Sequence, residues 1–146
     1  MLVKPIPAKY CLPLRQSVLR DGKALKYCHF EGDSQKSTYH LGAFSNDHLV
    51  GIVSLFKTAE PLLNFKSQYQ LRGMAVHTNY RGQAIGTKLI KNAEEYLKGK
   101  SMEVLWCNAR TSALEFYKKQ AYQIFSDEFE IEGVGPHFKL YKVLSP

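Results

Sequence analysis

The sequence contains no apolar run long enough to cross a membrane and no recognisable export signal. None of its apolar stretches approaches the roughly 18 residues of a membrane-spanning helix. The first residues, Met1–Pro5, lack the long apolar segment and the small-residue cleavage site of a secretory signal. These absences argue against a membrane protein and favour a cytoplasmic location.

Cysteine is scarce, and its spacing excludes the common metal motifs. The three cysteines, Cys11, Cys28 and Cys107, show no CxxC spacing, and no HxxxH pattern accompanies them. Cys107 follows Trp106 at the end of an apolar run, where packing accounts for a thiol. We therefore expect free thiols in a reducing compartment and no metal site.

Acidic residues are outnumbered by basic ones. Asp and Glu number 13 against 20 Lys and Arg, which leaves a formal charge of +7. This balance favours an anionic partner, although a solvated basic surface explains it equally well. The aromatic residues are spread over the expected strands and helices and do not flank a basic stripe. Nucleic acid is therefore a disfavoured partner, and a nucleic-acid-binding module stays the alternative from another class.

Apolar residues make up 45% of the chain, enough for one core, and a length of 146 residues is typical of one domain. We therefore expect a single domain over residues 1–146. In its first half, sequence patterns predict a strand, a helix, a long loop and three strands at residues 2–6, 13–20, 21–36, 37–44, 48–56 and 69–76. The turn Ser45-Asn46-Asp47 has hairpin chemistry, which indicates an antiparallel meander.

In the second half, helical periodicity replaces the run of strand patterns. An amphipathic helix is predicted by the apolar residues Ile85, Leu89, Ile90, Ala93 and Leu97, and Gly99 ends it. A strand, a helix and two strands follow at residues 102–107, 112–120, 122–130 and 137–143, and the spacing Ser-x-x-Glu at 112–115 predicts a capping box on the helix. We expect an α/β (α+β) fold with a mixed, mostly antiparallel sheet of about six to seven strands flanked by helices.

The chemistry is concentrated in the turn Arg81–Gly86, between a strand and the amphipathic helix. A helix N-terminus offers unpaired N–H groups and about half a positive charge, and small residues let an anion approach them. The turn lacks the Gly-Lys-Ser/Thr of a phosphate-binding Walker loop. The preceding meander and the missing acidic ribose ligand exclude the dinucleotide fingerprint. A phosphate or pyrophosphate site and a plain tight turn both fit the pattern.

Residues 71–89 resemble the signature of the GNAT superfamily of N-acetyltransferases, Gln/Arg-x-x-Gly-x-Gly/Ala between a strand and a helix. Arg81, Ala84 and Gly86 occupy its three defining places. Ala84 replaces the commoner glycine, which matters little if its φ is negative. Residues 106–122 resemble the second block of the family, Ala-x-x-Phe-Tyr-x-x-x-Gly-Phe, with Ala and Tyr in place of the final Gly-Phe.

This resemblance implies a GNAT fold, splayed between the fourth and fifth strands, and acetyl-CoA as co-substrate. The turn would wrap the pyrophosphate, and the strand ending at Val76 would pair with the pantetheine arm. Asn108 would act at the mouth of that slot, while a role in capping the next helix is equally compatible. The implied cofactor-binding residues are Met74, Ala75, Val76, Arg81, Gly82, Gln83, Ala84, Ile85, Gly86, Thr87, Asn108 and Phe116.

The resemblance also implies a reaction in which an amine attacks the thioester directly. Tyr117 would protonate the departing thiolate as a general acid, whereas helical spacing alone would make it an aromatic neighbour of the core. His77, Glu130 and His137 are candidates for the base, and the choice among them stays open. The side chain of Arg72 would either point into the acceptor cleft or project from the other face of the sheet.

Several alternatives remain at this level. A catalytically silent acetyl-CoA sensor would keep the phosphate turn without the chemistry. The acyl donor could differ from acetyl-CoA, and the acceptor could be a small-molecule amine or a protein or peptide amine. Edge strands near the C-terminus are compatible with a homodimer.

Overall fold

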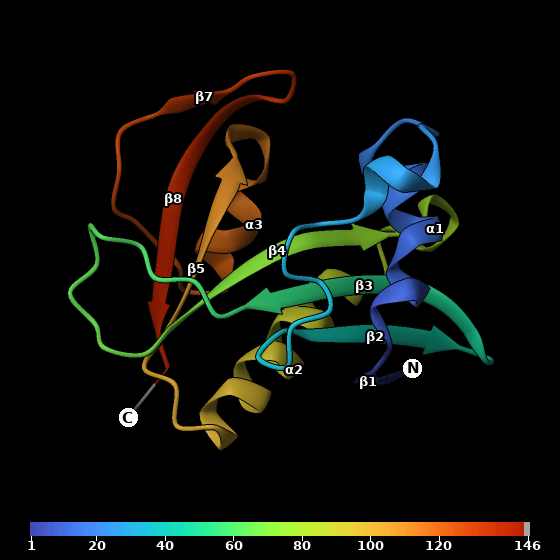
Figure 1. Ribbon diagram of the computed structural model, residues 1–146, viewed down its shortest axis with the longest axis horizontal. Coiled ribbons are helices and arrows are strands. Elements are labelled where there is room, and N and C mark those ends of the chain that lie inside the picture. The colour runs from blue at the N-terminus through green and yellow to red at the C-terminus, as the bar shows by residue number, and fades with distance from the viewer. Residues whose placement is uncertain (145–146) are drawn as a thin grey trace.

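The computed structural model describes residues 1–144 and contains an open, eight-stranded sheet (Figure 1). The strand order is β1-β2-β3-β4-β5-β8-β6, and β7 also pairs with β8. All pairs are antiparallel except β4 with β5. The strands span Leu2–Pro5 (β1), Tyr39–Ser45 (β2), His48–Phe56 (β3), Gln68–Val76 (β4), Val104–Arg110 (β5), Gln123–Ile124 (β6), Phe129–Ile131 (β7) and Gly135–Val143 (β8). The expected fold class is confirmed, with one or two strands more than the sequence indicated.

Helices cover both faces of this sheet (Figure 1). The long helix α2 packs on one face, and the short helical segment around α1 packs on the other, so that the core is divided into two apolar clusters. The helical elements are Ala8–Cys11 (η1), Leu12–Leu14 (α1), Arg15–Leu19 (η2), Leu25–Cys28 (η3), Thr78–Tyr80 (η4), Ile85–Gly99 (α2), Thr111–Ala113 (η5) and Leu114–Lys119 (α3). Within residues 1–144, no helix combines the length and the apolar character of a membrane span.

Helix α2 follows the apolar pattern that predicts it. Leu89, Ile90, Ala93 and Leu97 are fully buried, and they place the N-terminus of the helix against the end of β4. The hairpin between β2 and β3 is also confirmed. Its two turn residues have positive φ, 48° and 67°, as a type I′ turn requires.

The sheet splays between β4 and β5, as the resemblance implies. These two parallel strands pair only from Gln68–Leu71 against Val104–Cys107, and then they diverge. A bulge in β4 strengthens the twist at this point: Gly73 has a φ of 64°, and the register against β3 shifts there. From residue 72 onward, β4 pairs with β3 along one edge, while its other edge pairs with no strand in the described part of the chain.

Two local predictions are wrong. The strand expected over residues 122–130 is split into β6 and β7, because the Ser126 hydroxyl accepts the N–H of Lys139 at 2.8 Å in place of a strand partner. The capping box at residues 112–115 does not form. The chain enters α3 through the η5 turn, and the residue before α3 is Ala113, whose side chain cannot accept a hydrogen bond.

The C-terminus of α3 is a Schellman motif with alanine in the position that favours glycine. Ala121 has a φ of 71°, its N–H donates to Lys118, and the N–H of Tyr122 donates to Tyr117. A left-handed conformation costs a residue with a Cβ about 1–2 kcal/mol. Glycine avoids this cost, but it loses more conformational entropy on folding, which cancels part of the gain in stability.

We therefore expect Ala121→Gly to raise the free energy of unfolding by about 0.5–1 kcal/mol in urea denaturation. Ala24→Gly is the matched control, because Ala24 is exposed and has a φ of −52°. The control should be neutral or slightly destabilising. Equal effects of the two substitutions would contradict the strain assigned to Ala121.

Candidate functional site

The turn before α2 presents a row of backbone N–H groups that the protein itself does not use. Among the described residues, the amides of residues 82–87 donate to no protein acceptor, and the first amide of the helix with a partner is that of Lys88, which donates to Ala84 at 3.1 Å. Gly82 and Ala84 both have positive φ, 81° and 60°. Alternation of left- and right-handed residues curves successive N–H groups toward one point and forms an anion-binding concavity.

Ala84 corrects one expectation. Its replacement of the family's glycine was expected to matter little on the condition of a negative φ, but its φ of 60° and ψ of 25° are left-handed. The turn therefore keeps the backbone shape that glycine would adopt and carries strain of about 1–2 kcal/mol for it. Such strain at a ligand-binding turn is typical of a functional site.

A cavity of about 460 Å³ opens over this turn, and we call it the turn cavity. Most of the residues expected to bind the cofactor line it: Met74, Ala75, Val76, Arg81, Gly82, Ala84, Ile85, Gly86, Thr87 and Phe116. Gly86 permits this arrangement, since a Cβ there would lie 3.2 Å from the Phe116 ring. Gln83 belongs to the same turn without lining the cavity, and the Thr87 hydroxyl accepts a hydrogen bond from Gln120 at 3.2 Å. The unpaired edge of β4 runs along one side of the cavity.

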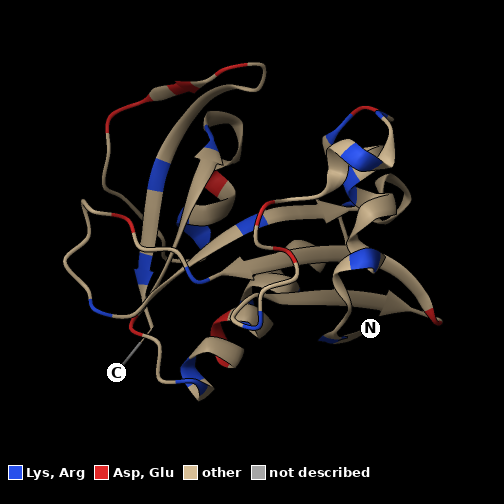
Figure 2. Cartoon of the chain, viewed as in Figure 1, with Lys and Arg blue, Asp and Glu red and all other residues tan. Residues whose placement is uncertain are grey.

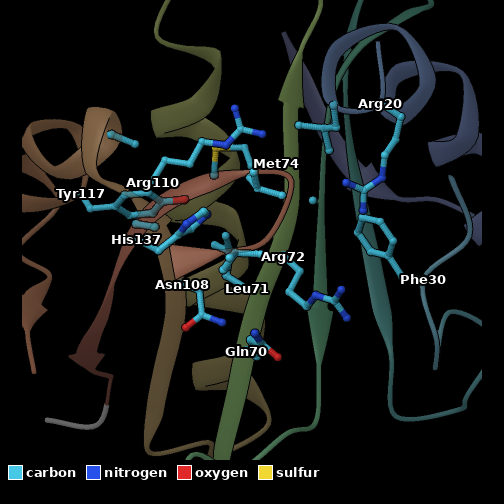
Figure 3. A pocket seen from close by; sticks show the side chains of 16 residues that line it. Arg20, Phe30, Gln70, Leu71, Arg72, Met74, Asn108, Arg110, Tyr117 and His137 are labelled. Carbon is cyan, nitrogen blue, oxygen red and sulfur yellow. The ribbon is translucent and has the colours of Figure 1, made fainter. Parts of the chain in front are cut away.

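A second cavity of about 360 Å³ lies at the splay between β4 and β5, and we call it the central pocket (Figure 3). Tyr117 and His137 lie on one side of it, and Arg20 and Phe30 lie on the other. Met74 lines both cavities. The two cavities therefore adjoin at Met74, and Tyr117 lines the second of them.

Tyr117 is held rigidly with its hydroxyl toward the central pocket (Figure 3). Its side chain is only 8% exposed and packs edge-to-face against Phe116 and Tyr122, with ring centres 5.2 and 5.7 Å apart. Burial, together with the neighbouring Cys107, raises the pKa of the Tyr117 phenol far above its ordinary value. Tyr117 is therefore a protonated donor at neutral pH.

Of the three candidate bases, only His137 lines the central pocket. Its Nδ1 lies 2.7 Å from the carbonyl oxygen of Gly135, so Nδ1 donates this hydrogen bond, and in the neutral imidazole the lone pair is on Nε2. His77 instead accepts the N–H of Asn79 at 3.1 Å, outside both cavities. Glu130 is exposed on β7 and also lies outside both cavities.

Asn108 lies in the central pocket and does not line the turn cavity. Its Oδ1 accepts a hydrogen bond from the Lys139 ammonium at 3.1 Å, and that ammonium also pairs with Glu60 at 2.9 Å. The alternative role of capping the next helix is wrong, because the residue before η5 is Arg110.

A buried polar network behind the central pocket was not predicted from the sequence. Arg15 is fully buried and makes two hydrogen bonds to the Asp33 carboxylate, at 2.7 and 3.0 Å. It also donates to the Ser54 hydroxyl and to the carbonyl of Cys28. His40 completes the network through Ser54 and the carbonyl of Asp33. The signal in the sequence was an arginine inside the apolar side of the first helix.

This network positions Phe30 in the wall of the central pocket. The Asp33 carboxylate accepts the N–H of Phe30 at 2.9 Å, and the Arg15 guanidinium lies 3.8 Å from the centre of the Phe30 ring. Burial by itself would raise the pKa of Asp33, but the hydrogen bonds from Arg15 and Phe30 outweigh it and hold that pKa below its ordinary value.

We expect Asp33→Asn to lower the free energy of unfolding by about 3 kcal/mol, because it leaves a buried arginine without its counterion. The lowered pKa of Asp33 contributes stability that is present above the unfolded value of about 4 and is lost as pH falls through the folded value. Urea denaturation from pH 3 to pH 7 should therefore show a smaller acid-induced loss in the variant. Asp127→Asn, at an exposed position, is the control. A variant as stable as that control at pH 7 would overturn the assignment.

Comparison with known proteins adds independent findings. The model of the "Acetyltransferase (GNAT) family" matches residues 10–122. The uncharacterized N-acetyltransferase YitI of Bacillus subtilis (strain 168) is 35% identical over 142 residues, which are 97% of this chain and 95% of that protein.

Solved structures share the fold at low sequence identity. An aminoglycoside 6′-N-acetyltransferase complexed with coenzyme A superposes with a TM-score of 0.80 at 14% identity, over 100% of this chain and 98% of the other. An acetyltransferase of the GNAT family from Streptococcus pneumoniae has a TM-score of 0.72 at 18% identity, over 99% of both chains.

Proposed function

Because the chain belongs to the acetyltransferase (GNAT) family, and is thus an acyltransferase that uses acetyl-CoA, we propose that Tyr117 is its general acid in the acetylation of a primary amine. One observation carries this proposal. The protonated hydroxyl of Tyr117 faces the pocket that meets the turn cavity at Met74. The acetyl end of a cofactor that occupies the turn cavity would therefore lie beside an acid.

The cofactor would bind mainly through the backbone. The unused amides of the Arg81–Gly86 turn supply donors for the pyrophosphate at the N-terminus of a 15-residue helix. The open edge of β4 at Met74–Val76 supplies main-chain groups for the amides of pantetheine, as an added strand would use them. Phe116 and Thr87 line the same cavity and complete its wall.

The reaction would begin after the ammonium form of the acceptor has lost one proton to solvent, when the neutral amine nitrogen attacks the thioester carbonyl. His137 Nε2, which has a lone pair, accepts the proton that the amine must lose. The C–S bond then breaks, the thiolate takes the phenolic proton of Tyr117, and the proton held by His137 restores the phenol. The products are the amide and free coenzyme A, so that protons balance. The raised pKa of Tyr117 keeps its phenol protonated, and it also makes proton transfer from the phenol to the thiolate less favourable.

The state of the buried thiol next to Tyr117 supports direct attack over an acetylated enzyme. Cys107 is 1% exposed, and burial raises the pKa of its thiol to about 12. A thiol in this state is not a nucleophile at neutral pH. The acetyl group would therefore pass from cofactor to amine in one ternary complex.

We expect Tyr117→Phe to lower kcat about 100-fold while the KM for acetyl-CoA stays within twofold, because only the proton donor is lost. Thiol release by the purified variant measures both constants. Tyr141→Phe is the control, since the Tyr141 hydroxyl bonds to Gln123 and lies outside both cavities. Unchanged turnover in Tyr117→Phe would remove Tyr117 from the mechanism.

We expect His137→Ala to lower kcat at least tenfold. Added imidazole should restore part of kcat, because it can occupy the space left by the side chain and act as the base. His77→Ala and Glu130→Gln test the rival bases and should keep kcat within twofold. Loss of activity that imidazole does not rescue, or an equal loss in either rival variant, would argue against His137 as the base.

A further inference from the structure

The central pocket carries positive charge without any acidic residue to balance it. Arg20, Arg72 and Arg110 line it, and no Asp or Glu does. Among residues 1–144, none of these three guanidinium groups forms an ion pair or a hydrogen bond with the protein. Figure 2 shows basic residues on the helical segment around α1 and on β4, with acidic residues at the end of that segment and on β7. The positive charge available to a bound molecule is therefore large.

Arg20 and Arg72 converge on one aromatic ring. Their guanidinium carbons lie 5.4 and 4.7 Å from the centre of the Phe30 ring, and that of Arg15 lies 3.8 Å from it. Arg15 is already neutralised by Asp33, but the other two are not. Burial, and then the nearby charge of Arg15, lower the pKa of Arg72, while Asp33 partly opposes them.

The rest of the lining limits the size and character of the ligand. A cavity of about 360 Å³ matches a small molecule. Apolar side chains from both walls contribute much of its surface, namely those of Leu19, Phe30, Leu71, Met74, Ile131 and Val134. Such a lining suits a ligand with an apolar body and one charged end.

On the basis of the proposed function, we propose that the acceptor is a small primary amine that also carries an anion, a carboxylate or a phosphate, held by Arg20 and Arg72. Its amine then lies on the opposite side of the pocket, beside Tyr117 and His137 (Figure 3). A guanidinium group binds either anion through two parallel hydrogen bonds. The same uncompensated charges repel polycationic amines such as aminoglycosides and polyamines.

Matched pairs of amines test this proposal directly. Phenylalanine and phenethylamine differ by one carboxylate, and phosphoethanolamine and ethanolamine differ by one phosphate. Thiol release from acetyl-CoA should give a kcat/KM about 100-fold higher for the anionic member of at least one pair, and spermidine and kanamycin should be the poorest acceptors. The pair with the larger ratio identifies carboxylate or phosphate. Equal kcat/KM values within both pairs, or a polycationic amine used as well as the better anionic amine, would overturn the proposal.

Two variants link that preference to the arginines. Arg72→Gln and Arg20→Gln should each raise the KM for the anionic amine at least tenfold and leave kcat/KM for its neutral counterpart within twofold. Arg72→Lys, which keeps the charge and loses the planar fork, should retain part of the preference. Lys91→Gln removes one positive charge from the exposed face of α2 and should change nothing. A preference that survives both glutamine variants would contradict the assignment.

The failure of this proposal is distinguishable from that of the proposed function. Acetyl-CoA should raise the melting temperature of wild type and of all four variants alike, because the turn cavity is intact in each. Thiol release with neutral amines alone would leave the function standing and sink the anionic acceptor. If none of the amines tested supported thiol release, the proposed function itself would be wrong.

Discussion

The buried ion pair between Arg15 and Asp33 is the constraint on which the geometry of the pocket depends. It joins the first helical segment, the long loop after it and the centre of the sheet, which are separated by 18 to 39 residues along the chain. Two dehydrated charges are costly unless the polar atoms near them have partners, and here the Cys28 carbonyl, the Ser54 hydroxyl and the Phe30 N–H supply partners beyond the pair itself. The Nε of Arg15 is the exception, since it is buried without a hydrogen bond. The network therefore specifies one position for Phe30 and, through it, for one wall of the pocket.

The opposite wall is built by different means. Tyr117 and His137 are held by aromatic packing and by one hydrogen bond to a carbonyl, on elements that follow the splay. The splay separates the two walls, and the β4 bulge at Gly73 sets the point where it starts. One wall thus carries Arg20 and Phe30, and the other carries Tyr117, His137 and Arg110.

The sequence predicted those elements whose structure depends on residues close together in the chain. The helix from Ile85 and the hairpin at Asn46 depend on residues close together in the chain, and both were found as expected. The splay came from resemblance to a family, since no single segment encodes it. The left-handed Ala84 was missed because its conformation depends on the turn around it, and residue type alone favours the opposite sign of φ. Arg15 was missed because its partners Asp33 and Ser54 lie 18 and 39 residues away in sequence.

Beyond Leu71, the β4 edge that faces β5 pairs with no strand in the described part of the chain. An open strand edge is a template on which another chain can add, and the end of β4 is flanked by apolar side chains such as Met74 and Phe116. Pantetheine laid along that edge would occupy the same main-chain groups that self-association needs.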